Sequence, residues 1–296
     1  MKTLRDIGED ALIERLVRLV PRDENPTAAP GDDCAVIDPG PGSSTLLLLK
    51  TDALVERVHF LSDASARAVG WKSVARVISD FAAMGGQPGH FLITLALPPE
   101  TTVTWVEDLY RGIADCLEKF GGVVAGGETS SVPTGSSAVI SIAATGSVLR
   151  NRLVLRSTAK PGDVLFVTGL LGGSIHGKHL DFTPRIEAAD WLVSHFKPTA
   201  MMDLSDGLAK DLTRMAKASG CGFTIGEAAL PLTPGCTPAQ ALGDGEDFEL
   251  LFALEAERAS ELTATWPFPD LPLTRIGKIV RSGQGESLTG GWEHFL

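Results

Sequence analysis

The sequence predicts an α/β (α+β) protein built as two domains. Short apolar runs that suit buried strands alternate along the chain with longer segments whose apolar residues recur at helical spacing. The chain has 296 residues, of which 44% are hydrophobic, and this is enough for two medium-sized cores. A polar break at 149–156, marked by three arginines, separates two apolar segments. We therefore expect a first domain over 1–149 and a second over 150–296.

The N-terminal segment combines a helix, a loop and a strand. Residues 7–20 place apolar side chains at the spacing of an amphipathic helix, which Pro21 ends. A Pro-rich loop over 22–31 follows. Residues 45–51 are a short apolar run with a polar end, which predicts a buried strand that delivers Asp52 to its carboxyl end.

The rest of the first half continues the alternation. Asp63 is expected to cap a long helix rich in alanine and valine, which ends at about Met84 because Gly85 and Gly86 follow. Asp80 would then lie near the last turn of this helix. The remaining elements are a strand over 90–97, a helix over 103–120 and an interior strand over 138–148.

The second half opens with Lys160-Pro161-Gly162-Asp163, a turn signal before a strand over 164–168. The glycine-rich residues 169–174 have the composition of a phosphate-cradling loop. The chain contains neither G-x-x-x-x-G-K-[ST] nor G-x-G-x-x-G, however. We therefore favour a tight turn between a strand and a helix at these residues.

Composition argues against several classes of function. The formal net charge of −11 argues against a nucleic-acid surface, which needs a clustered basic face. The four cysteines are scattered without a C-x-x-C pair, so we expect no zinc site or disulfide framework, and a reducing cytoplasm fits best. Acidic residues within the first 20 positions rule out the apolar region of a signal peptide. No apolar run approaches the ~20 residues of a spanning helix, so we expect no membrane contact.

Six short acidic loops indicate the chemistry. Each places a carboxylate among glycine, alanine or aliphatic residues, where a buried charge without a partner is costly. Few lysines or arginines are near these loops in the sequence, so we expect a hard divalent metal, which prefers oxygen ligands and often binds together with phosphate. The loops therefore predict a magnesium-dependent enzyme that acts on phosphates. They are Gly31-Asp32-Asp33, Thr51-Asp52, Ser79-Asp80, Gly127-Glu128-Thr129, Asp203-Leu204-Ser205-Asp206-Gly207 and Gly245-Glu246-Asp247.

Taken in order, these motifs resemble the thiamine-monophosphate kinase family, which belongs to the ATP-binding superfamily of aminoimidazole ribonucleotide synthetase. The resemblance also includes His59-Phe60, Arg156 with the turn at 160–163, and Trp292-Glu293-His294-Phe295, so it spans the chain. Six motifs in one order are far more specific than any single motif. The resemblance implies a two-domain fold and a homodimer whose N-terminal sheets form a shared β-barrel.

The resemblance also implies an activity, the direct, magnesium-assisted transfer of the γ-phosphoryl group of ATP to thiamine monophosphate. Such a transfer depends mainly on positioning the phosphates and neutralising their oxygens, and a phosphate acceptor needs no strong general base. Carried over by position, several magnesium ions would be held by Asp33, Thr51, Asp52, Asp80, Glu128, Asp203 and Asp206. ATP would contact Gly127, Glu128, Arg156 and Ser205, and thiamine monophosphate would contact His59, Glu246 and Trp292.

Alternatives remain for single residues and for the whole chain. Glu128 stands where the family has aspartate, so a metal at this position must be reached by a longer side chain. For Asp32, Asp163 and Asp244, turn chemistry is the favoured explanation. Helix capping would account for Asp203, Ser205 or Asp206, and packing or surface exposure for His59, Arg156 and Trp292. The competing functions are another ATP-dependent synthetase of the same superfamily and a non-catalytic regulator that binds nucleotide or metal.

Overall fold

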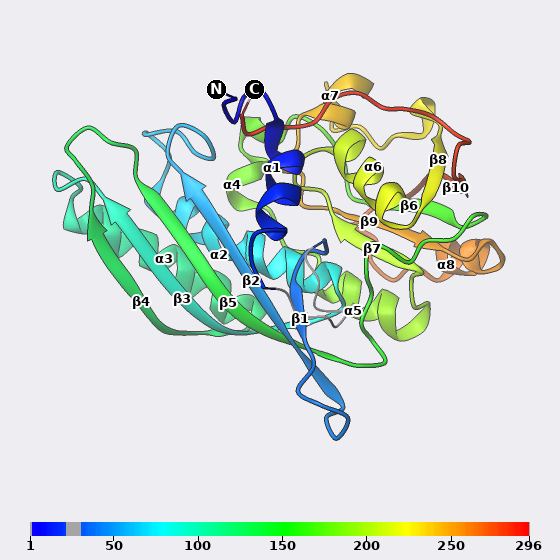
Figure 1. Cartoon of the computed structure of the whole chain (residues 1–296), viewed down its shortest axis with the longest axis horizontal. Coiled ribbons are helices and arrows are strands. Elements are labelled where there is room, and N and C mark those ends of the chain that lie inside the picture. Colours follow the sequence, from blue (N-terminus) through cyan, green and yellow to red (C-terminus); the bar gives the residue numbers. More distant parts are fainter. Residues whose placement is uncertain (1, 22–30, 296) are drawn as a thin grey trace.

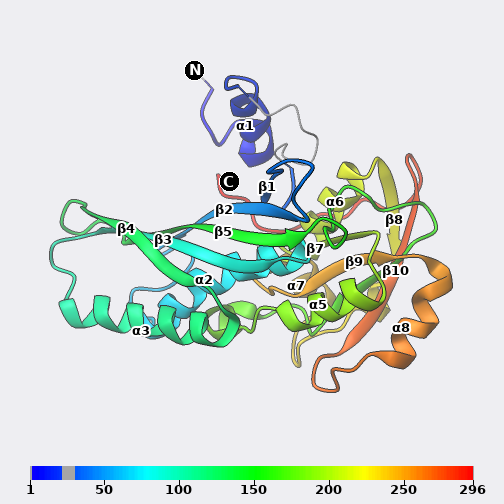
Figure 2. The ribbon, with the colours of Figure 1, turned by 90° about the horizontal axis from the view of Figure 1, so that it is seen from below.

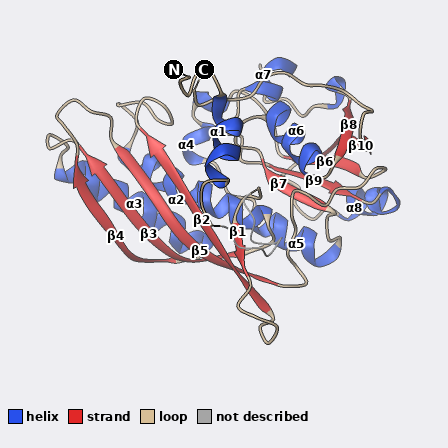
Figure 3. Cartoon of the chain, viewed as in Figure 1, coloured by secondary structure: helices blue, strands red, loops and turns tan. Residues whose placement is uncertain are grey.

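The structure, a computed structural model, describes residues 2–21 and 31–295 and contains two five-stranded sheets with helices packed on them. Figure 1 and Figure 3 show the two sheets in neighbouring halves of the molecule, with both chain ends on the same side. This confirms the expected two-domain α/β class. The expected boundary at residues 149 and 150 falls where the last strand of the first sheet ends, and it remains a prediction. The Pro-rich loop expected over 22–31 lies outside the described residues except for Gly31.

The N-terminal sheet has the strand order β1-β2-β5-β3-β4, with β3 and β4 parallel and the other pairs antiparallel. The strands and helix expected over 90–97, 138–148 and 103–120 are confirmed. The elements of this half are α1 (Gly8–Val17), β1 (Ala35–Ile37), β2 (Thr45–Val55), α2 (Ala66–Ala83), β3 (Gln87–Leu97), α3 (Val103–Phe120), β4 (Val123–Ser131) and β5 (Val139–Leu149).

Helices α2 and α3 cover one face of this sheet, which we call the inner face (Figure 2). Along β2, Leu48 and Leu54 are buried on the inner face, whereas Leu47 and Leu49 are exposed on the outer face. The alternation continues through Asp52, so β2 extends to Val55. The expectation that Asp52 lies at the carboxyl end of its strand was therefore wrong, because three further residues of β2 follow it.

The start of α2 also differs from the prediction. The helix begins at Ala66 with Ser65 at its N-cap position, and the backbone N–H of Ala64 donates to the carbonyl of Leu61. This turn keeps Asp63 outside the helix, so Asp63 is not the cap. The predicted end of the helix is confirmed, since Met84 is the C-cap residue and Asp80 lies in the last turn.

The C-terminal sheet is antiparallel throughout, with the strand order β7-β9-β6-β10-β8. Its apolar core continues the core of the first half on one side and packs beneath α6 on the other. The elements of this half are β6 (Val164–Thr168), α4 (Lys178–Asp181), α5 (Ile186–His195), β7 (Ala200–Asp203), α6 (Leu208–Ala218), β8 (Cys221–Ile225), α7 (Pro238–Gly243), β9 (Leu250–Leu254), α8 (Ala259–Thr265) and β10 (Leu273–Arg281).

Helix α1 is held mainly by charge. It is shorter than the expected 7–20, and none of its residues is buried. Glu9 lies 3.2 Å from the Nζ atom of Lys210 on α6, and Asp10 lies 3.1 Å from Arg214 on the same helix. Among the described residues, no helix is long and apolar enough to cross a membrane.

Candidate active site

Three buried carboxylates meet where the two halves of the chain join. Asp33 comes from the loop before β1, Asp80 from the last turn of α2, and Asp203 from the end of β7. Each offers a carboxylate oxygen within 4.8 Å of the others. We call this group the aspartate cluster. Oxygen ligands at this spacing suit a hard divalent cation.

The cluster has cationic partners that the sequence analysis did not foresee. Lys50 Nζ lies 2.7 Å from Asp80 Oδ1, and the Arg156 guanidinium donates to Asp33 Oδ1. Ser79 Oγ donates to Asp203 Oδ2 at 2.6 Å. The expectation that few cations lie near the acidic loops was therefore wrong, because residues distant in sequence supply them. Among the residues that the structure describes, two cations contact the three carboxylates, which leaves one negative charge in excess.

The raised pKa values of two cluster carboxylates agree with a site that binds a cation. Burial and the neighbouring charge of Asp33 raise the pKa of Asp203 to about 6. Burial also raises the pKa of Asp80 well above its ordinary value, although Lys50 opposes the shift. Among the described residues, the buried Oδ2 atom of Asp33 has no hydrogen-bond partner. An unpaired carboxylate oxygen in a crowded acidic site fits a bound metal.

A cavity of about 230 Å³ brings together the three residues expected to contact the substrate. His59, Glu246 and Trp292 all line it, together with Ser205 and Asp206. The remaining lining residues are Val58, Arg76, Ser174, Ile175, Asp244, Phe248 and His294. Trp292 is 45% exposed, so it is not a core residue, and its backbone N–H donates to the Asp206 carbonyl.

Glu246 has an unusual backbone conformation, and its side chain binds a fully buried lysine. Its φ of 53° is in the left-handed region, which residues other than glycine rarely adopt. Lys72 Nζ donates to Glu246 Oε2 at 2.8 Å and to the His59 carbonyl at 2.6 Å. Burial opposes ionisation of Glu246, but hydrogen bonding by His179 and the charge of Lys72 lower its pKa to about 2. Oε1 of this ionised carboxylate is buried and has no partner among the described residues.

His59 is neutral in this environment. Burial and the nearby charge of Arg76 lower its pKa to about 4. Its Nδ1 accepts a hydrogen bond of 3.0 Å from the backbone N–H of Val55, so the proton of the neutral ring lies on Nε2. Neither ring nitrogen is left as a free nucleophile.

Several residues expected to bind metal lie outside the aspartate cluster. Asp52 Oδ2 lies 3.1 Å from Arg76 Nε. Asp206 forms ion pairs with Lys210 and Arg214, at 3.2 and 2.5 Å. The Thr51 side chain points to the outer face of the sheet because side chains alternate along β2.

The Gly127-Glu128 pair lies on β4, the exposed edge strand. Glu128 aligns through Thr94 and Ser141 with Ala53 on the outer face, three strands or about 14 Å across the sheet. Its described side-chain contact is a hydrogen bond from Ser130. A Cβ at Gly127 would lie 2.1 Å from the Ile93 carbonyl oxygen, so close strand packing alone explains this glycine. The structure therefore does not bring either residue to the aspartate cluster within one chain.

Helix capping does not explain the acidic segment before α6. Gly207 occupies the N-cap position of α6 without a side-chain cap, so Asp203, Ser205 and Asp206 are not capping residues. Instead, Asp211 accepts hydrogen bonds from the backbone N–H groups of Ser205 and Asp206.

Of the three turn aspartates, Asp163 follows the turn explanation, because it accepts from the backbone N–H of Lys160 within its own turn. Asp32 and Asp244 instead accept from the backbone N–H groups of Arg156 and Gly173, which are 124 and 71 residues away. These two aspartates therefore connect distant segments.

The sequence analysis missed the cations of the site. Lys72 and Arg76 lie on α2 at four-residue spacing before Asp80, so the three side chains share one face of the helix. Polar residues at this spacing within an otherwise apolar helix were the available signal.

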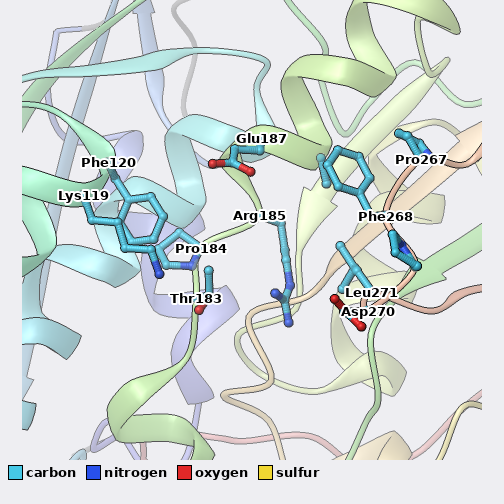
Figure 4. Close-up of a pocket in the computed structure, with 12 residues that line it drawn as sticks. Lys119, Phe120, Thr183, Pro184, Arg185, Glu187, Pro267, Phe268, Asp270 and Leu271 are labelled. Carbon is cyan, nitrogen blue, oxygen red and sulfur yellow. The ribbon is translucent and has the colours of Figure 1, made fainter.

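A second cavity, of about 320 Å³, contains none of the expected site residues. It lies between the end of α3, the segment before α5 and the segment before β10. Figure 4 shows Lys119 and Phe120 on one side and Phe268 on the other, with Arg185 between them. Arg185 is bound to the buried Glu249 through two hydrogen bonds of 2.7 and 2.6 Å. This cavity therefore has a cation that is already paired.

The fold and the site together define an AIR synthase related protein. The chain matches the N-terminal domain of that family over residues 31–148 and its C-terminal domain over residues 160–289. A thiamine-monophosphate kinase of Rhodopirellula baltica is 39% identical, over 84% of this chain and 82% of the relative. That of Aquifex aeolicus is 33% identical, over 99% of both chains. The chain belongs to the thiamine-monophosphate kinase family.

A solved structure agrees with this membership. The structure described as AaThiL complexed with AMPPCP and TMP superimposes with a TM-score of 0.86 at 32% identity. The superposition covers 100% of this chain and 99% of the chain in that structure. The thiamine-monophosphate kinase of Aquifex aeolicus solved separately has a TM-score of 0.78 at 30% identity, over 96% of this chain and 97% of its own.

Proposed function

We propose that this chain transfers the γ-phosphoryl group of ATP directly to thiamine monophosphate and forms thiamine diphosphate. The observation that carries the proposal is the aspartate cluster beside a cavity that contains His59, Glu246 and Trp292. The segment 203–206 connects the two, because Asp203 belongs to the cluster and Asp206 lines the cavity. A relative of the same fold holds an ATP analogue and TMP.

Magnesium would be held by Asp33, Asp80 and Asp203, whose crowding and unpaired oxygen fit a hard cation. When bound, the metal neutralises charge on the phosphate oxygens. The chain's own groups keep the ligands oriented: Lys50 holds Asp80, and Ser79 holds Asp203. Thr51, Asp52, Glu128 and Asp206 remain proposed ligands for further ions.

The thiamine part of the acceptor carries a cationic thiazolium ring, and the cavity suits such a ring. The ionised Glu246 offers an unpartnered oxygen, and the exposed Trp292 indole offers an aromatic face. An aromatic face attracts a cation by about 0.5–2 kcal/mol. These two groups favour a planar cation over a neutral ring.

ATP would approach from another side of the aspartate cluster. A cavity of about 610 Å³ between α1 and α6 is lined by four cations, Arg18, Arg156, Arg214 and Lys217, and by three carboxylates, Asp10, Glu14 and Asp32. The cations exceed the carboxylates by one, which favours an anionic ligand such as a nucleotide. Gly127, Glu128 and Ser205 remain proposed ATP contacts.

Direct transfer is favoured over a phosphoenzyme. Neither nitrogen of His59 is free to attack, because Nδ1 accepts from the backbone and Nε2 carries the proton. The backbone N–H of Ser205 binds Asp211, and no described base contacts its hydroxyl.

A homodimer is favoured by the outer face of the N-terminal sheet. Leu47, Leu49, Leu92 and Leu149 are 38–49% exposed there, and β4 is an exposed edge strand. An apolar sheet face and an open edge are typical of an interface. The four cysteines are free, which supports the proposed cytoplasmic location.

Phosphorus NMR tests the activity. The full-length chain is incubated with ATP, magnesium and thiamine monophosphate, and we expect the diphosphate signals of thiamine diphosphate and ADP. Thiamine replaces thiamine monophosphate in the control, and ATP should then remain intact. Binding of ATP without turnover in the complete mixture would refute the kinase proposal and favour a non-catalytic regulator.

A further inference from the structure

We propose that Arg76 binds the phosphate of the acceptor substrate and so makes the site select a phosphate monoester over the free alcohol. This inference rests on the proposed function and names a residue that reads the acceptor phosphate. Arg76 lies on α2 and lines the cavity that contains His59, Glu246 and Trp292.

The first argument is that the guanidinium has unused donors. An arginine side chain carries five N–H donors. Among the described residues, Arg76 makes one long hydrogen bond, 3.4 Å from Nη1 to the Ala53 carbonyl. Its Nε lies 3.1 Å from Asp52 Oδ2, but the geometry gives no hydrogen bond, and this buried nitrogen remains unpartnered. A buried cation whose donors are unsatisfied is stabilised by an anion that accepts from it.

The second argument is its place along α2. Lys72, Arg76 and Asp80 share one helix face, and each four-residue step advances about 6 Å along the axis. Lys72 contacts Glu246, which lines the cavity, and Asp80 belongs to the aspartate cluster. Arg76 therefore lies between the site of the ring and the site of the metal. The acceptor phosphate must occupy this interval, because it connects the thiamine part to the transferred group.

The third argument is the distribution of charge. Glu246 provides a negative oxygen and Arg76 a positive group in the lining of the same cavity. A substrate with a cationic ring and an anionic phosphate offers a partner to each of these groups. A planar guanidinium also offers two parallel donors to phosphate oxygens, which the compact ammonium of lysine does not.

The test compares two ligands that differ only in the phosphate. Calorimetry with magnesium and without ATP gives the dissociation constants of thiamine and thiamine monophosphate for the wild type and for Arg76→Met. We expect the preference of the wild type for the monophosphate to fall about ten- to hundredfold in Arg76→Met, the loss typical of a charge-assisted hydrogen bond. Arg76→Lys should recover part of it.

Arg67→Met is the matched control. Arg67 lies on the same helix and pairs with Asp115 at 2.5 Å, outside the cavity, so its removal should leave the preference unchanged. The preference is a ratio of two affinities, so a general disturbance of the cavity cancels from it. If Arg76→Met weakens the binding of thiamine and of thiamine monophosphate equally, the assignment of Arg76 to the phosphate is wrong. The proposed function would still hold in that case, provided that the wild type turns over. A wild type that neither binds nor phosphorylates thiamine monophosphate would instead refute the proposed function itself.

Discussion

Replacing Asp203 by asparagine should stabilise the metal-free protein and abolish its response to magnesium. Asp203 is 3% exposed and shares the aspartate cluster with Asp33 and Asp80, where no cation of the described residues contacts it directly. Without metal, its charge is repelled by the neighbouring carboxylates. Removing that charge should therefore relieve the folded state, although the same change removes a metal ligand.

Two routes give similar magnitudes for the relief. The pKa of Asp203 is raised from 3.8 to about 6, which makes the ionised form cost about 3 kcal/mol at pH 8. Two unit charges 4.8 Å apart repel by about 3.5 kcal/mol at an effective dielectric constant near 20. Asparagine still accepts from Ser79, but the loss of charge weakens that hydrogen bond by about 1 kcal/mol. We therefore expect Asp203→Asn to raise the free energy of unfolding by about 2 kcal/mol.

The pH dependence follows from the direction of the shift. A raised pKa in the folded state means that this group's contribution to stability is complete below pH 3.8 and is lost as pH rises through about 6. The advantage of the asparagine variant should therefore be small at pH 4 and full at pH 8.

Chemical unfolding in a metal chelator and in saturating magnesium measures both effects, with turnover followed in parallel. Asp163→Asn is the control, because Asp163 is a buried aspartate outside the cluster that accepts from Thr199 at 2.6 Å. It should lower stability with and without magnesium. If Asp203→Asn is destabilised in chelator at pH 8, or if magnesium stabilises it as it does the wild type, the assignment of the cluster as a metal site is refuted.

Three further changes test other parts of the site. Trp292→Ala should raise the KM for thiamine monophosphate several-fold with little change in melting temperature, because Trp292 is 45% exposed. A large drop in melting temperature with both KM values unchanged would make it a packing residue. Glu128→Asp should retain turnover, since Glu128 is exposed on β4 and contacts Ser130; loss of activity would mean that the strand depends on the longer side chain. Burial raises the pKa of Asp247 to about 7. The difference in unfolding free energy between Asp247→Asn and the wild type should therefore grow in favour of the variant by on the order of 2 kcal/mol as the pH rises from 5 to 8. A gap that does not change with pH in denaturant titrations would contradict that shift.

The sequence predicted the regular elements of the first half well and their ends less well. The helix over 103–120 agrees with the structure because Thr102 caps it and Gly121 ends it, and both signals are local. The start of α2 was missed because Asp63 and Ser65 are both good caps. A turn between Leu61 and Ala64, made by the backbone, decides between them.

The expected site residues fall into two groups for a physical reason. His59, Glu246 and Trp292 meet in one cavity although they lie far apart in sequence, and only their place in a family pattern predicted this. Thr51 and Glu128 lie on the outer face of the sheet. Side chains alternate between the two faces of a sheet, so the position of a residue along its strand determines the face on which it lies. A short motif does not contain this information.

The folded protein favours a metal for a different reason from the one that the sequence suggested. Isolated acidic loops predicted a cation because few lysines or arginines were near them in sequence, but Lys50 and Arg156 reach Asp80 and Asp33 from 30 and 123 residues away. What remains is an imbalance within the described part of the chain, in which three buried carboxylates contact two cations and one oxygen of Asp33 is unpaired. A divalent cation would convert that single negative charge into a single positive one. Phosphate oxygens would then restore neutrality, so the charge balance of this buried site favours metal and phosphate together over either one alone.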